Sequence, residues 1–151
     1  MKDLNSYLFK SNFEKVAKLI QEGVDLNGTY RIGVRPIIAA INSDNTKMLS
    51  FIITKGADVN IDNGLPLYET IDICIDGMIQ DNRSEPHQVY LEMIKILLMN
   101  GAKLELKNER AERAIDLIVQ YAYSEKRFDR LKSYFRPLIP EIDALIKRKS
   151  N

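Results

Sequence analysis

Apolar residues recur along most of the chain at spacings of three and four, which is the pattern of helices that bury one side. Three of these apolar runs are followed by a glycine and then by a short polar-apolar-polar segment. They are KLIQEGVDLN (18–27), FIITKGADVN (51–60) and ILLMNGAKLE (96–105). Because glycine adopts positive φ without a Cβ clash, it is a common residue just past the end of a helix. We therefore predict that a helix stops at each of Gly23, Gly56 and Gly101.

A further helix is predicted after each glycine stop. In RPIIAAI (35–41), proline takes the first helical position, where its missing N–H costs nothing. LPLY (65–68) repeats this arrangement, and RAIDL (113–117) keeps the register without proline. The unit is thus helix, tight turn, helix, glycine stop and a polar extended finger. Its period is 33 residues from Gly23 to Gly56 and 45 from Gly56 to Gly101, so the second interval carries an insertion.

These repeats resemble the ankyrin repeat over about residues 4–122. The segment GADVN (56–60) matches the end of the family pattern letter for letter, and Pro36 has the family's spacing to the glycines on either side. The sequence departs from the family at the threonine and histidine positions. These positions hold Arg35, Leu65 and Arg113, and Ile38, Tyr68 and Asp116.

The resemblance implies an all-α fold, an ankyrin-like helix-turn-helix solenoid with short extended fingers. Each repeat of such an array buries its apolar side only against its neighbours, so we expect the array to be capped at both ends. A length of 151 residues suits one domain. The expected segments are an N-terminal cap repeat (1–27), a repeat (28–60), a repeat with an insertion near 75–89 (61–105), and a last repeat with the C-terminal cap (106–151).

The inserted segment lies between Tyr68 and Gly101. Residues 68–80 contain no proline, and Ile71, Ile75 and Ile79 are spaced by four. A polar turn segment follows, and Pro86 opens the next helix. We therefore expect a first helix lengthened by about two turns, a loop, and a second helix over about 87–99.

Composition narrows the possible classes of function. The chain is 45% hydrophobic, and its single cysteine and single histidine exclude a disulfide framework and a thiolate zinc cage. A formal net charge of +1 offers no bulk attraction to nucleic acid or membranes, so neither is expected as a partner. No apolar run reaches the roughly 20 residues that span a bilayer, and the N-terminus lacks a signal-peptide core. We expect a cytoplasmic protein without a cofactor, monomeric when free.

Two patterns with possible chemistry are weak. Oxygen-bearing side chains between Asp58 and Glu69 have the spacing of a calcium loop, but such a loop needs glycine at its sixth position, where this chain has Asn63. Cys74 and His87 are the residue types of a nucleophile and its base. However, Cys74 lies among isoleucines on a predicted helix, where a free cysteine usually acts as a small buried hydrophobe. We expect no metal site and no enzyme.

Charge is distributed unevenly along the chain. Residues 58–92 hold eight acidic residues and one basic residue, whereas residues 103–151 hold 12 basic and 8 acidic. On the lengthened helix, Glu69, Asp72 and Asp76 are spaced by three and four and therefore share one side, although like charges at this spacing repel. The alternative interpretations are an ordinary solvated side of the helix and a docking surface for a basic partner.

The resemblance places the binding surface of the array on its concave face, which is formed by the fingers and the exposed side of the first helices. The tyrosine of the first finger is a hot-spot type of residue, and it could equally cover a neighbouring finger. The candidate contact residues are Tyr30, Arg31, Ile32, Val34, Asn42, Ser43, Asp62, Glu69, Asp72 and Asp76.

Together these features predict a non-catalytic module that binds another protein across the concave face. The partner is expected to have a basic surface. A specific hypothesis is a bacterial immunity protein, whose acidic face would cover the basic active site of a cognate toxin. The alternatives are an ankyrin adaptor or host-directed effector and, as the weakest class, an enzyme.

Overall fold

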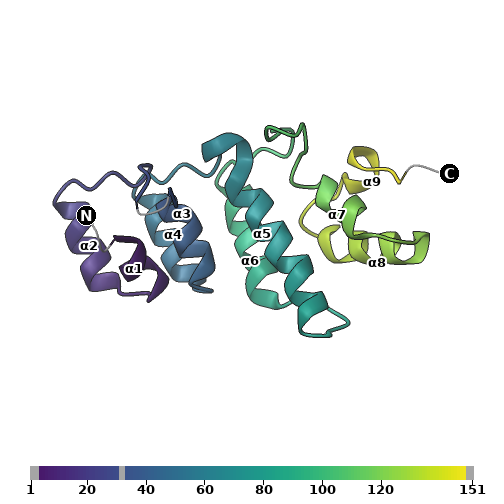
Figure 1. Cartoon of the computed structure of the whole chain (residues 1–151), viewed down its shortest axis with the longest axis horizontal. Coiled ribbons are helices and arrows are strands. Elements are labelled where there is room, and N and C mark those ends of the chain that lie inside the picture. The colour runs from purple at the N-terminus through teal and green to yellow at the C-terminus, as the bar shows by residue number, and fades with distance from the viewer. Residues whose placement is uncertain (1–3, 31–32, 149–151) are drawn as a thin grey trace.

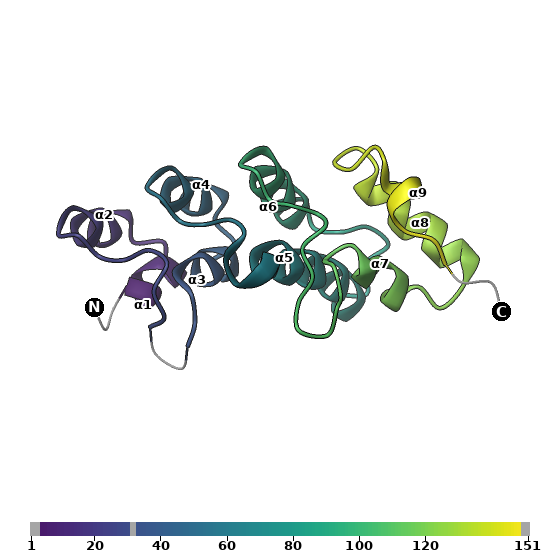
Figure 2. The ribbon, with the colours of Figure 1, turned by 90° about the horizontal axis from the view of Figure 1, so that it is seen from above.

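The computed structural model of the chain is a row of paired antiparallel helices, described over residues 4–30 and 33–148 (Figure 1). The helices are α1 (Leu4–Phe9), α2 (Phe13–Gln21), α3 (Pro36–Asn42), α4 (Thr46–Thr54), α5 (Ile61–Gln80), α6 (Gln88–Met99), α7 (Asp116–Tyr121), α8 (Glu125–Phe135) and α9 (Ile142–Leu145). The first helices α1, α3, α5 and α7 stack in one row, and α2, α4 and α6 form a second row that α8 continues (Figure 2).

The predicted glycine stops end α2, α4 and α6. Gly23, Gly56 and Gly101 have φ of 89°, 111° and 93°. After each glycine, the next N–H donates to the carbonyl five residues back, as from Ala57 to Ile52 at 2.9 Å. This is the Schellman arrangement, which satisfies carbonyls at the end of a helix.

Short polar side chains begin three of the helices. Asn12 accepts from the Lys15 N–H at the start of α2, Asn45 caps α4, and Ser124 caps α8. In α3 the first helical residue is Pro36, as expected, because proline there gives up no intrahelical hydrogen bond. The helix boundaries are therefore encoded by nearby residues.

Helix α5 contains both unusual features of the third repeat. Its first turn is left-handed, with Asp62, Asn63 and Gly64 at φ of 53°, 57° and 90°, and Pro66 then begins the regular helix. From this proline, α5 extends to Gln80, whereas α3 extends only from Pro36 to Asn42. The prediction of a first helix lengthened by about two turns is confirmed, as is the second helix, α6.

The fingers are held together by two asparagines. The Asn27 side chain donates to the Gly56 carbonyl at 3.0 Å and accepts from the Asp58 N–H at 2.8 Å. Asn60 does the same one repeat later, with Gly101 and Lys103, at 2.9 Å each. Each asparagine therefore joins one finger to the next.

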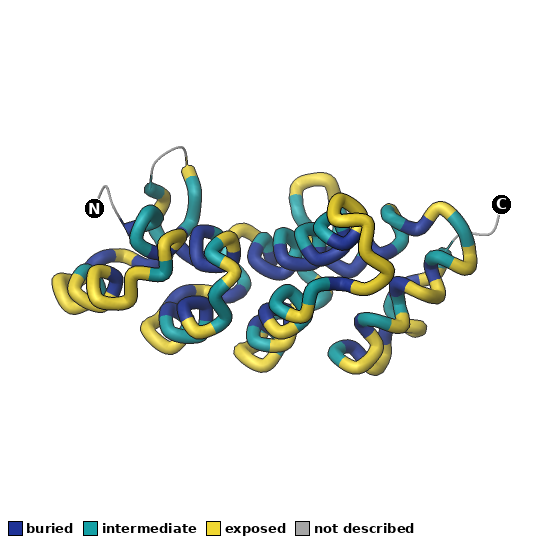
Figure 3. Tube along the Cα trace, turned by 90° about the horizontal axis from the view of Figure 1, so that it is seen from below, coloured by how far each residue is buried: buried dark blue, intermediate teal, exposed yellow. Residues whose placement is uncertain are grey.

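A continuous core runs between the two rows of helices, as the buried segments in Figure 3 show. Phe128, Leu131 and Phe135 of α8 and Ile142 of α9 cover its C-terminal end. Strand pairing among the described residues is limited to two isolated bridges, Tyr30 with Val34 and Lys107 with Arg113, both in fingers. The expected all-α solenoid with short extended fingers is confirmed. In the part of the chain that the structure describes, no helix has the length and apolarity to cross a membrane.

Candidate functional site

Three acidic side chains lie on one side of α5, at spacings of three and four. Glu69, Asp72 and Asp76 are each half-buried against neighbouring elements. The Tyr121 hydroxyl of α7 donates to Asp72 at 2.7 Å, which fixes this carboxylate between two repeats. Burial, and then the charge of Asp72, raise the pKa of the Glu69 carboxyl above its usual value.

These three carboxylates are half-buried close together on one helix without a counter-ion. Over residues 4–30 and 33–148, no lysine, arginine or histidine lies within ion-pair distance of any of them. Some other acidic groups are paired, as in Arg113 with Asp116 at 2.9 Å and Lys132 with Asp143 at 2.9 Å. Since like charges brought together without a counter-ion cost free energy, the α5 cluster is the strongest candidate contact surface.

Asp62 is instead paired with an arginine, although it is exposed. The Arg35 guanidinium forms two hydrogen bonds to its carboxylate, at 2.8 and 2.9 Å, and a third to the Asn27 carbonyl at 2.8 Å. This hydrogen bonding to Arg35 lowers the pKa of Asp62. The arginine at the family's threonine position therefore ties its own finger to the next one, and Asp62 has a structural role besides any contact it makes.

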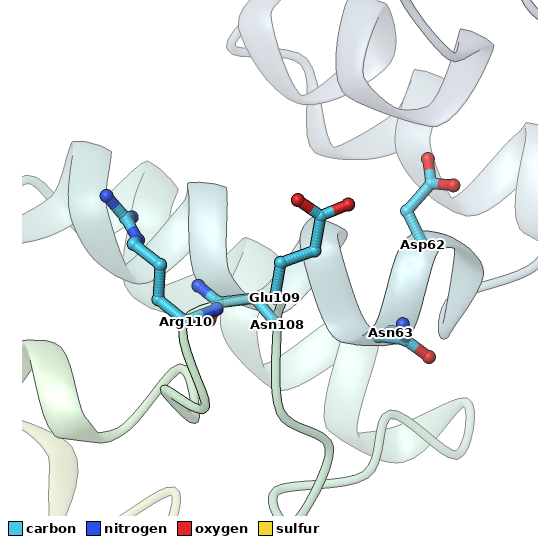
Figure 4. A pocket seen from close by; sticks show the side chains of 5 residues that line it. All are labelled: Asp62, Asn63, Asn108, Glu109 and Arg110. Carbon is cyan, nitrogen blue, oxygen red and sulfur yellow. Dashed lines mark hydrogen bonds between the residues drawn. The ribbon is translucent and has the colours of Figure 1, made fainter.

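A hollow of about 500 Å³ lies beside Asp62, between the first turn of α5 and the finger that precedes α7. Figure 4 shows Asp62 and Asn63 on one side of it, and Asn108, Glu109 and Arg110 on the other. The adjoining space is also lined by Tyr68 and Glu69, so it connects the finger to the acidic cluster.

The N-terminal candidate residues Tyr30, Val34 and Asn42 line one hollow of about 320 Å³, together with Phe9 of α1. The Tyr30 hydroxyl donates to the Asp25 carbonyl at 2.5 Å, so this ring packs over its own finger while one side lines the hollow. Tyr30 is therefore bonded within its own finger and not to a neighbouring one, and it stays a candidate contact through the hollow. The candidates Arg31 and Ile32 lie outside the described residues.

Ser43 is engaged in the turn between α3 and α4. Its hydroxyl donates to the Ala40 carbonyl at 2.5 Å and accepts from the Asn45 N–H at 3.2 Å. These bonds stabilise the turn, and the neighbouring Asn42 is the exposed polar residue at this end of α3.

The residues of the two weaker chemical patterns are buried or make structural contacts. Cys74 is 0% exposed, and burial raises the pKa of its thiol to about 12, so it holds no thiolate at neutral pH. The His87 ring bonds Asp81 at 2.6 Å across the loop between α5 and α6. Asp58 accepts from the Asn60 N–H at 2.8 Å, as the first residue of a turn. No cluster of metal-ligating side chains occurs among the residues that the structure describes.

Sequence analysis missed the aromatic residues around the acidic cluster. Tyr121 bonds Asp72 from 49 residues away, and Arg110 donates to the Tyr68 hydroxyl at 3.3 Å across 42 residues. The repeat register of Asp116 was a partial signal, because it places Tyr121 one and a half turns further along the same helix. The bond from Tyr121 to Asp72 has no local sequence pattern, because it forms between two repeats.

The stacked helix pairs, Schellman stops and interleaved fingers define a helical repeat solenoid. The particular fold is the ankyrin repeat: the structure is similar to the ankyrin repeat domain of Bcl-3, described as a unique member of the IkappaB protein family. The two share a TM-score of 0.59 and 21% sequence identity over 85% of this chain and 50% of that chain. The chain thus spans half the length of that domain. No protein-family model and no curated protein matches the sequence.

Proposed function

We propose that this protein binds another protein across its concave face, with the acidic cluster of α5 at the centre of the contact. The ankyrin-repeat fold is generally a non-catalytic protein-interaction module. The observation that carries the proposal for this chain is the half-buried triad Glu69, Asp72 and Asp76, for which the described residues supply no counter-ion. A basic surface of a partner would provide one, and such complementarity raises both association rate and specificity.

The specific role within this proposal is immunity, in which the protein covers the basic, nucleic-acid-binding site of a cognate toxin. Its support is the charge of residues 58–92, a segment that contains eight acidic residues and one basic residue. A small module with such a surface can mask a basic active site without any chemistry of its own. An ankyrin adaptor or host-directed effector is the alternative role for the same face.

The test is a double substitution, Glu69→Lys with Asp76→Lys, which reverses two of the three charges and leaves the Asp72–Tyr121 bond in place. The matched control is Glu22→Lys with Glu92→Lys, which makes the same charge change at exposed positions by the second row of helices. Affinity for a partner recovered by pull-down from the native source is measured by calorimetry. We expect about a hundredfold loss for the first variant, since like charges across an interface cost several kcal/mol.

Two outcomes would contradict the proposal at different levels. Equal affinity of the two double variants would remove α5 from the interface. For the immunity role, the protein is co-expressed with the toxic protein encoded beside it, and restored growth is expected with the wild type and the control variant only. Failure of the wild type to restore growth would leave the adaptor role for the same face.

A further inference from the structure

The two extra turns of α5 create a second hollow, away from the fingers. It has a volume of about 420 Å³ and lies between the C-terminal end of α5, the loop after it, and the junction of α7 and α8. Met78 and Ile79 form its apolar wall, and Tyr121 and Tyr123 face them from the junction. Two arginines, Arg83 and Arg127, also line it, together with Asn82. A first helix as short as α3 would supply neither the apolar wall nor Arg83.

The arginines of this hollow have no acidic partner. Among the described residues, neither Arg83 nor Arg127 forms an ion pair. The Nε of Arg127 is buried and has no hydrogen-bond acceptor. This nitrogen is enclosed by the protein, so only the other nitrogens of the Arg127 guanidinium can serve a ligand in the hollow.

Neighbouring groups hold both arginines in place. The Arg127 guanidinium lies 5.2 Å from the centre of the Tyr123 ring, and Tyr123 is 79% exposed to solvent. Arg83 donates to the Glu85 carbonyl at 3.2 Å, and the Ser84 carbonyl in between accepts from Arg130 and Tyr134 of α8. The loop that carries Arg83 is therefore fastened to the helix that carries Arg127.

We propose that this hollow binds a carboxylate group of a protein partner, from an acidic residue that is followed by an apolar one. The arginines recognise the carboxylate, because a guanidinium presents paired donors that match two oxygens. Ile79, which is 42% exposed, and the tyrosine rings receive the apolar side chain. A volume of this size, near the lower end for ligand pockets, suits one or two side chains.

The acidic cluster lies beside the hollow, because Tyr121 lines the hollow and also bonds Asp72 at 2.7 Å. Its carboxylates weaken the attraction of the two arginines for any anion. The contact of the neighbouring apolar side chain with the apolar wall therefore has to favour the peptide over a free phosphate.

This inference is independent of the proposed function, since the hollow and the acidic cluster contain different residues. The experiment follows backbone amide shifts of the full ¹⁵N-labelled chain on titration with the peptide acetyl-Gly-Glu-Leu-Phe-Gly-amide. The comparison probes are the same peptide with glutamine in place of glutamate, and inorganic phosphate. We expect saturable shifts confined to residues 78–83 and 121–127, with the glutamine peptide at least about tenfold weaker.

Substitutions distinguish specific recognition by the Arg127 guanidinium from a general effect of positive charge on peptide binding. Arg127→Gln is expected to weaken the glutamate peptide about tenfold, and Arg127→Lys less, because lysine keeps the charge and loses the paired donors. The matched control is Lys126→Gln, which removes one exposed positive charge beside it and is expected to change affinity less than twofold. The thermal midpoint of Arg127→Gln should stay close to that of the wild type, since the lost contact with the Tyr123 ring is offset by the removal of a buried donor without an acceptor.

Several results would overturn the proposal. They are equal affinity for the glutamine peptide, tighter binding of phosphate than of the glutamate peptide, an equal loss in Lys126→Gln, and no saturable shift at millimolar peptide. None of these results bears on the acidic cluster, which the double lysine substitution tests separately.

Discussion

At the scale of single residues, asparagine at the end of the repeat pattern does what few side chains can. Asn60 donates through its Nδ2 to the Gly101 carbonyl and accepts through its Oδ1 from the Lys103 N–H. An amide offers a donor and an acceptor side by side, so it replaces a strand neighbour between two fingers. In the following repeat the same position holds Glu105, which has no amide donor, and among the described residues this bridge stops there.

Replacing Asn60 therefore tests this bridge. Asn60→Ala removes both bonds and is expected to lower the free energy of unfolding by about 1–2 kcal/mol, as measured in urea. Asn60→Asp keeps the acceptor and loses the donor, so its loss should be intermediate. A loss in Asn60→Asp as large as that in Asn60→Ala would show that the acceptor contributes nothing.

At the scale of elements, the insertion is braced against the C-terminal cap instead of projecting freely. Its loop, residues 81–87, is closed by the contact between Asp81 and His87 and fastened by the Ser84 carbonyl to Arg130 and Tyr134 of α8. The sequence predicts the longer helix, because isoleucines continue at spacing four. It does not predict the brace, because its donors lie about 50 residues further along the chain.

Removing one hydroxyl should loosen this brace. In Tyr134→Phe we expect faster hydrogen exchange at the Arg83 amide, which donates to the Met78 carbonyl at the end of α5, and a loss of about 0.5–1.5 kcal/mol in stability. The control is Tyr123→Phe, since Tyr123 is 79% exposed and its hydroxyl has no partner in the described part of the chain. Equal exchange rates in the two variants would contradict the brace.

At the scale of the whole molecule, carboxylates contribute to stability with opposite signs. Hydrogen bonding to Arg35 lowers the pKa of Asp62, so its contribution is present above the unfolded value and is lost as pH falls through the folded one. Burial and Asp72 raise the pKa of Glu69, so this group is most favourable at low pH, and its contribution is lost as pH rises through the folded value. At neutral pH the ion pair of Asp62 with Arg35 thus stabilises the fold, whereas the charge of Glu69, a candidate contact residue of the same repeat, destabilises it.

The matched pair Asp62→Asn and Glu69→Gln separates these signs. Asparagine accepts the left-handed backbone at position 62, so the loss in Asp62→Asn, about 0.5–1 kcal/mol at pH 7, reports on the ion pair. This loss should shrink as pH falls toward the lowered pKa of Asp62. Glu69→Gln is expected to raise stability at pH 7 and to have no effect at acid pH. Urea unfolding of both variants from pH 3 to 7 measures these effects, and a destabilised Glu69→Gln at pH 7 would contradict this assignment.

The sequence by itself determined the helix stops, the repeat length and the lengthened helix. Each depends on preferences that neighbouring residues carry, such as the positive φ of Gly56 and the spacing of apolar residues. Only the tertiary structure decided which charges are paired. Arg35 holds Asp62 across 27 residues, and Tyr121 holds Asp72 across 49, while Arg83 and Arg127 share a hollow without an acid. Electrostatic energies depend on distance and burial in space, and the chain acquires these only when the repeats stack.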